Sequence, residues 1–183
     1  MNKFTKLALV GLISGFSSQL RAEALDGYIA LTGGLIKHMS ASDQSAGKAS
    51  RYMGRLDFVR VQKNVALDLR FGSGMDYQDM GGAFKVFHHF AFSGSTATGI
   101  SLGGGLGGMY SRAGVEGTNA TFYELFSPVF ARVIFDMGLG FGLLLDAEYN
   151  AMFQRRYPDG EVSDNSKVAN RFFFGAGIAI TAM

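Results

Sequence analysis

Histidine and serine are the residues of this chain best suited to nucleophilic chemistry, and they stand close together at His38 and Ser40. Side chains two positions apart share one face of a β-strand. The histidine could therefore act as a general base for the serine in the hydrolysis or transfer of an acyl ester. This chemistry also needs a carboxylate to orient the histidine, but the nearest acid, Asp43, lies in a predicted loop. We therefore interpret the two residues as a polar pair that leads into a loop.

A second candidate is the adjacent pair His88 and His89, which interrupts an apolar alternation. Alternation places His88 on the face of Phe84 and Phe90, where a polar ring is costly. Three explanations are open: a β-bulge that turns both rings to the other face, a contact surface in an oligomer, or acid-base chemistry on acyl groups. The bulge is the preferred one. No metal site is expected, because neighbouring strand residues point apart and only His38 remains as a third imidazole.

The glycine-rich stretch 103–108 has the spacing G-x-G-x-x-G of a dinucleotide-binding loop. Such a loop must open a helix, whereas Leu102 and Leu106 continue an alternating strand with no helical segment after it. We therefore expect no cofactor. The glycines are instead predicted to line a narrow interior, where they leave room for long side chains opposite them.

The elements that would position these residues follow from a hydrophobic period of two, which is typical of β-strands. From Val65 to Phe71 the odd positions are large and apolar, and the even ones are Ala, Asp and Arg. Strands need about 9 to 11 residues to cross a bilayer at a tilt. The pattern predicts eight strands near or above this length, at residues 27–38, 52–61, 65–71, 83–92, 99–109, 122–135, 139–153 and 170–182.

The links between these strands alternate in length. Four are long, at residues 39–51, 72–82, 110–121 and 154–169, and three are short, at residues 62–64, 93–98 and 136–138. A transmembrane barrel with both termini in the periplasm has short turns on the inner side and longer loops on the outer side. A soluble sandwich has no reason to sort its loops in this way. The links therefore favour the membrane barrel.

The face opposite the apolar one carries charges of both signs. Five basic and six acidic residues share it: Arg55, Arg70, Lys85, Arg132, Arg171, Asp57, Asp68, Glu124, Asp136, Asp146 and Glu148. Buried charges are tolerated when they are paired or hydrated, and an eight-stranded barrel is just wide enough for side chains to fill it. The sequence therefore predicts a lumen closed by a network of ion pairs.

Residues 1–24 have the composition of an export signal. Two lysines precede an apolar run from Leu7 to Phe16, and Ala22 and Ala24 stand where a signal peptidase reads small residues. This segment holds three of the 17 basic and one of the 15 acidic residues, so its removal leaves 14 of each sign. A chain without net charge or a basic patch is not expected to bind nucleic acid.

The sequence resembles the small outer-membrane barrels of Gram-negative bacteria, of the OmpA-barrel and OmpX kind. The resemblance is carried by the export signal, the eight alternating strands, the alternately long and short links and the final strand Arg171–Ile180. The resemblance implies an all-β fold, an eight-stranded antiparallel up-and-down transmembrane barrel over residues 25–183, with both termini periplasmic. Two features depart from that family: the chain ends on Met183 instead of an aromatic residue, and it has no Trp.

We expect such a barrel to have a structural or adhesive role through its outer loops, for a surface ligand that the sequence does not indicate. Its expected partners are outer-membrane lipids, lipopolysaccharide and the barrel-assembly machinery, and an oligomer could form through the face of His88. Two alternatives are open. One is a membrane-embedded enzyme that modifies lipid A by acyl ester hydrolysis or transfer, with His38, Ser40 and His88 as candidates. The other is a narrow solute channel.

Overall fold

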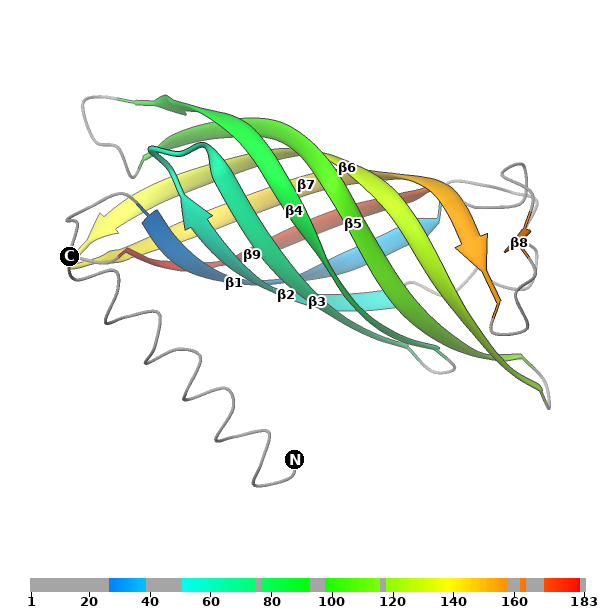
Figure 1. The fold of residues 1–183 in the computed structure, drawn as a ribbon. Helices are drawn as coiled ribbons and strands as arrows, with labels where there is room; N and C mark the ends of the chain where they lie inside the picture. Colours follow the sequence, from blue (N-terminus) through cyan, green and yellow to red (C-terminus); the bar gives the residue numbers. More distant parts are fainter. Residues whose placement is uncertain are drawn as a thin grey trace, which may run out of the picture.

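The computed structural model describes residues 27–38, 51–74, 77–92, 98–115, 118–157, 162–163 and 170–181. These residues form antiparallel strands that wrap around one another at a strong tilt (Figure 1). The strands are β1 (Gly27–His38), β2 (Arg51–Arg60), β3 (Val65–Gly74), β4 (Tyr77–Ala91), β5 (Gly99–Val115), β6 (Thr118–Gly138), β7 (Phe141–Arg156), β8 (Val162–Ser163) and β9 (Arg171–Thr181).

Eight of these strands close into a barrel. The sheet order is β6, β5, β4, β3, β2, β1, β9 and β7, and β6 also pairs with β7. β8 is a two-residue strand that pairs only with the end of β7. Closure leaves none of the eight strands as an unpaired edge, and it confirms the predicted fold class. The predicted export signal and the terminal Met183 lie outside the described residues.

The two faces of the strands have the polarity that the period-two pattern predicts. Along β7, Leu143 is 50% exposed while its neighbour Leu144 is 1% exposed, and the alternation continues for most of the strand. Large apolar side chains therefore point out of the barrel as well as into it. Within the described residues, no helix has the length and hydropathy needed to cross a bilayer.

β1 begins and β9 ends at the same end of the barrel, which we call the near end, and the opposite end is the far end (Figure 1). Two long loops predicted for the far end, 72–82 and 110–121, are wrong. β3 runs to Gly74 and pairs with the first residue of β4, and β5 runs to Val115 and pairs with the first residue of β6. Backbone hydrogen bonds continue beyond the apolar band, where hydropathy no longer alternates.

The turn between β6 and β7 also lies later than the predicted 136–138. Asp136 to Gly138 belong to β6, and the turn consists of Leu139 and Gly140. Both turn residues have positive φ, 56° and 78°, and Leu139 is 87% exposed. Two positive φ values in succession are typical of the type I′ turns that join antiparallel strands. The predicted strand 139–153 therefore begins two residues too early.

The interior glycines of β5 make room for aromatic rings. A Cβ at Gly107 would collide with the ring of Phe126 and would lie 2.8 Å from the Cβ of Ala83. Phe126 is fully buried. The sequence predicted that such glycines accommodate long charged side chains, and at this position a phenylalanine ring takes the space instead.

We expect Gly107→Ala to lower the free energy of unfolding by about 1–3 kcal/mol, because overpacking forces neighbouring side chains out of their preferred rotamers. Gly33→Ala is the matched control, since a Cβ there meets nothing within 4 Å. Urea unfolding of the refolded barrel, followed by circular dichroism, measures both. Equal losses in the two variants would contradict the packing role of Gly107.

Candidate functional site

Among the residues that the structure describes, twelve charged side chains are buried in the interior of the barrel, none more than 9% exposed. Six are basic and six are acidic: Arg55, Arg70, Lys85, Arg132, Arg155, Arg171, Asp57, Asp68, Asp79, Glu124, Asp146 and Glu148. Their formal charges therefore cancel. They fall into two groups, which we call the central cluster and the far cluster.

The central cluster is built around Arg55 of β2. Its guanidinium lies 3.3 Å from carboxylate oxygens of both Asp146 and Glu148 and 3.5 Å from those of Asp57 and Asp68. None of these contacts is a short hydrogen bond, and the three guanidinium nitrogens make none. Arg55 is therefore held by the summed attraction of four carboxylates from three strands.

The other basic groups of the central cluster bind the same carboxylates directly. Arg70 donates through Nε and Nη2 to the two oxygens of Asp68, at 2.9 and 2.8 Å. Lys85 Nζ lies 2.6 Å from both Asp68 and Glu148. Paired hydrogen bonds between a guanidinium and a carboxylate are among the strongest polar contacts in proteins. The carboxylates thus connect β2, β3, β4 and β7 across the bore.

Arg132 of β6 completes the central cluster. It donates to Asp57 at 2.8 Å and to Asp146 at 2.9 Å from Nε. Since Asp57 and Asp146 also face Arg55, each carboxylate serves two cations. If Arg132 is lost, each of its carboxylates keeps a single cation, and that cation also pairs with other carboxylates.

The far cluster centres on Glu124 of β6. Arg155 donates to one of its oxygens at 2.9 and 3.1 Å, and Arg171 donates to the other. The Ser111 hydroxyl donates to Asp79 at 2.6 Å, and Asp79 lies 3.6 Å from Arg171. These contacts tie β4, β5, β6, β7 and β9 together near the far end.

Apolar layers separate and flank the two charged clusters. One layer lies between them and consists of Ile36, Met53, Ala83, Met109, Phe126, Met152 and Phe173. A second lies at the near end and includes Tyr28, Val59, Phe87, Phe130 and Leu144. Cations stack on rings at the borders of these layers: Arg70 lies 4.5 Å from the centroid of Phe126, and Lys85 lies 4.8 Å from that of Phe130. Such contacts stabilise buried cations.

The structure places ten of the eleven predicted lumen charges in these clusters, and the exception is Asp136. This residue is exposed beside the β6–β7 turn, where its carboxylate accepts a hydrogen bond from the amide of Gly138 at 2.9 Å. A register shift between Asp136 and Gly138 marks the end of the regular ladder, so the alternation that placed Asp136 inside does not extend to it.

Sequence reasoning missed two members of the far cluster, Asp79 and Arg155, because both were assigned to loops. Each lies in a strand that runs beyond its apolar portion. Asp79 shares inward parity with Lys85, and this parity could have found it had the strand been extended to residue 77. For Arg155 the signal is weaker, since β6 and β7 contain a register shift at Leu125 and Phe126.

The structure rejects a bulge at the two histidines. β4 and β5 pair without a register shift through His88 and Leu102 and through His89 and Ser101. His88 points outwards with its ring 4.5 Å from that of Phe90 in an edge-to-face contact. His89 points inwards, and its Nδ1 lies 2.9 Å from the Ser101 hydroxyl. The oligomer contact through His88 stays a prediction.

The candidate pair His38 and Ser40 falls at the edge of what the structure describes. The backbone of His38 pairs with Arg171 at the end of β1, and Ser40 lies outside the described residues. Within the described part of the chain, no group of three or more His, Cys, Asp or Glu side chains is arranged to hold a metal ion.

We expect Arg132→Ala to lower the free energy of unfolding by about 3–5 kcal/mol, because it leaves two buried carboxylates, Asp57 and Asp146, that must share the guanidinium of Arg55 as their close cation. Asp136→Asn, which removes an exposed charge but keeps a side-chain acceptor, should change it by less than about 0.5 kcal/mol. The double variant Arg132→Met with Asp146→Leu should lose less than the sum of the single losses. Urea unfolding measures the unmodified protein, Arg132→Ala, Asp136→Asn, the single variants Arg132→Met and Asp146→Leu, and the double variant. Strictly additive losses in the double variant would argue against a direct interaction between Arg132 and Asp146.

No protein-family model matches the chain, and no curated protein matches it. Among solved structures, Neisserial surface protein A is similar with a TM-score of 0.62 and 12% identity, over 84% of this chain and 96% of that one. The N-terminal β-barrel domain of Pseudomonas aeruginosa OprF is similar with a TM-score of 0.54 and 12% identity, over 86% and 98%. The chain therefore has the fold of the small eight-stranded outer-membrane barrels, as the resemblance implied.

Proposed function

We propose that this chain is a structural protein of the bacterial outer membrane, with its near end in the periplasm. Its outward face consists mostly of exposed large apolar side chains, which suits contact with lipid. Tyrosines gather at the far end of this face: Tyr52 is 70% exposed and Tyr123 is 54% exposed, and the rings of Tyr110 and Tyr123 stack edge to face. Aromatic residues at this level are typical of membrane interfaces.

The observation that carries the proposal of a closed interior is the charge balance of the twelve buried ionic side chains. Each of the six carboxylates lies within 3.6 Å of a basic group. A water-filled pore would instead leave such groups solvated and more than marginally exposed. With apolar layers on both sides of the central cluster, the interior acts as a polar core that holds the barrel rigid and blocks the flow of ions.

The far end supports a role in contacts at the cell surface. β5 has 17 residues and β6 has 21, against 12 in β1 and 10 in β2, so the longer strands project beyond the shorter ones (Figure 1). Gln78, Arg112 and Arg156 are exposed on this projecting part. We infer that these paired strands present part of an adhesive surface at the far end. Lipopolysaccharide and the barrel-assembly machinery are the other proposed partners.

A role in lipid A modification receives less support. The outward neighbours of His88 are Val86 and Phe90 on its own strand and Leu102 across the pair. Acyl transfer by a histidine would need a carboxylate and a nucleophile within hydrogen-bond reach, and these described neighbours offer neither. We therefore propose a role without catalysis.

A single cysteine in place of Arg112, at the far end, should react with a membrane-impermeant maleimide in intact cells. A cysteine in place of Lys63, in the near-end turn, should react only after the outer membrane is permeabilised. The chain has no native cysteine, so labelling reports one site at a time. The reverse pattern would place the near end outside the cell.

The unmodified protein, reconstituted in a planar bilayer, should show no large steady conductance, because ion pairs and apolar layers that fill a bore leave no path for hydrated ions. A variant with Arg155→Ala and Glu124→Ala should still conduct little, since the central cluster remains. Large, stable current steps from the unmodified protein would overturn the closed interior and favour the solute channel.

A further inference from the structure

The outward apolar face of the barrel is short on β1, β2 and β3. On β2 it extends from Tyr52 to Phe58, and the next outward residue towards the near end is Arg60. On β3 it extends from Val65 to Phe71 and is followed by Ser73. At about 3.3 Å per residue and a tilt of about 35–45°, such a stretch rises roughly 15 Å through a membrane.

The same face is about twice as tall on β4, β6 and β7. On β4 it runs from Met80 to Phe92 with only Gly82 and His88 between the larger apolar side chains, and on β7 it runs from Phe141 to Phe153. Twelve residue steps at the same tilt rise roughly 29 Å. The extra height lies mostly at the near end, in Phe90, Phe92, Phe135, Met137, Leu139 and Phe141, which are 44–87% exposed.

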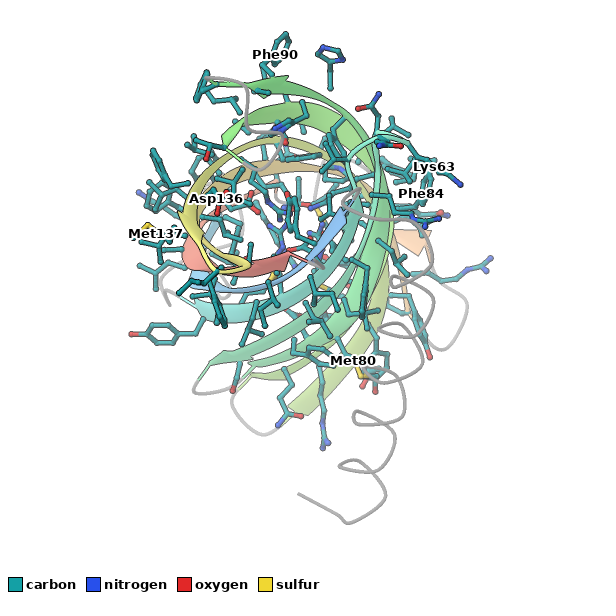
Figure 2. The ribbon with its side chains drawn as sticks, turned by 90° about the vertical axis from the view of Figure 1, so that its left-hand side faces the viewer. Lys63, Met80, Phe84, Phe90, Asp136 and Met137 are labelled. Carbon is teal, nitrogen blue, oxygen red and sulfur yellow. The ribbon has the colours of Figure 1, made fainter. Side chains whose placement is uncertain are left out.

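The view of the near end shows the two sides of the barrel together (Figure 2). Lys63 lies on one side of the barrel, while Phe90 and Met137 lie elsewhere around the rim and point away from the barrel. A cation on one side and apolar side chains on the other are thus presented at the same end. A flat bilayer of one thickness cannot match both sides.

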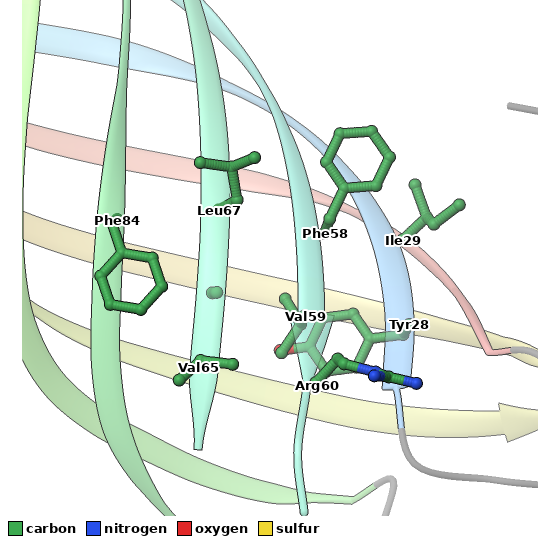
Figure 3. Close-up of a pocket in the computed structure, with 9 residues that line it drawn as sticks. Tyr28, Ile29, Phe58, Val59, Arg60, Val65, Leu67 and Phe84 are labelled. Carbon is green, nitrogen blue, oxygen red and sulfur yellow. The ribbon is translucent and has the colours of Figure 1, made fainter. Parts of the chain in front are cut away.

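The short side has the features of a lipid contact. A hollow of about 170 Å³ is lined by Ile29, Phe58, Leu67 and Phe84 among others, with Arg60 at its lower edge in Figure 3. An apolar wall that ends at a guanidinium is complementary to an acyl chain that ends at a phosphate headgroup. On this side, the outward apolar face therefore ends at Arg60 and Lys63.

We propose that the barrel contacts a bilayer of two thicknesses, thinner along β1–β3 than along β4–β7. The inference rests on the proposed membrane location. Barrels of this type carry an apolar band about 25 Å tall, so the tall side exceeds this height and the short side falls below it. Tilting can centre the two sides in the membrane but cannot equalise their heights, and the lipid must adapt by thinning beside the short side.

Single cysteines test this proposal, because one tall strand and the short side each offer a pair of positions at opposite ends. Leu125 and Met137 lie at the two ends of the face on β6, and Ser73 and Lys63 lie just outside the two ends of the apolar face on β3. Each cysteine carries a bimane label, and the protein is reconstituted in dioleoylphosphatidylcholine vesicles. Quenching by a nitroxide on the acyl chain is compared with quenching by aqueous iodide.

The labels at Leu125 and Met137 should both be quenched several-fold more by the acyl nitroxide than by iodide, and those at Ser73 and Lys63 more by iodide. If one of the two β6 labels meets water while the other meets lipid, the barrel is merely tilted and the proposal fails. It also fails if all four labels respond alike.

Two controls separate this inference from the proposed function. Gel mobility with and without heating shows whether each labelled barrel is folded, and protection from added protease shows whether it is inserted. A folded protein that stays outside the vesicles would overturn both the membrane location and the two-thickness proposal. A folded, inserted barrel with equal label depths would overturn the two-thickness proposal alone.

Discussion

Charge balance inside a closed ring is the condition on which the rest of this structure depends. An ion taken from water into a protein interior costs several kcal/mol unless a counter-ion and hydrogen bonds replace its hydration. In the described part of the chain six cations and six anions are buried together, and Arg55 lies among four carboxylates at 3.3–3.5 Å. Because these partners come from different strands, each ion pair is also a link across the bore.

Packing around these charges depends on residues of very different size. Gly107 leaves the space that the ring of Phe126 occupies, and Phe126 in turn faces the guanidinium of Arg70. The apolar layer that contains Phe126 separates the central cluster from the far cluster, and a second apolar layer lies at the near end. Low water access on both sides strengthens the ion pairs, so the glycines, rings and charges stabilise one another as a unit.

An interior of this kind turns the usual polarity of a globular protein inside out, and the outer surface follows from it. With the charges inside, the large apolar residues face outwards and need a lipid environment. The height of that apolar surface differs around the barrel, since Arg60 ends it on β2 while Leu139 extends it past the end of β6. The projecting strands at the far end supply the polar surface that the proposed contacts require.

The sequence by itself determined which side chains face in and which face out, since a strand alternates whatever its neighbours are. That rule was enough for eight strands, a barrel with an apolar exterior, and ten of the charged residues in the interior. It was not enough where alternation stops. Asp136 and Arg155 lie past register shifts between β6 and β7, and Asp79 lies in a part of β4 that the sequence analysis assigned to a loop.

Only the tertiary structure decided where these three residues lie, because backbone hydrogen bonding continues past the apolar band and its register is set by the partner strand. The regular ladder between β4 and β5 kept His88 outside and His89 inside, against the expected bulge. The pairing also decided which charges meet: Arg132 and Asp57 are 75 residues apart in sequence and 2.8 Å apart in space. Such a contact forms because closure of the barrel brings distant strands together, and the residue pattern of one strand does not show which strands will meet.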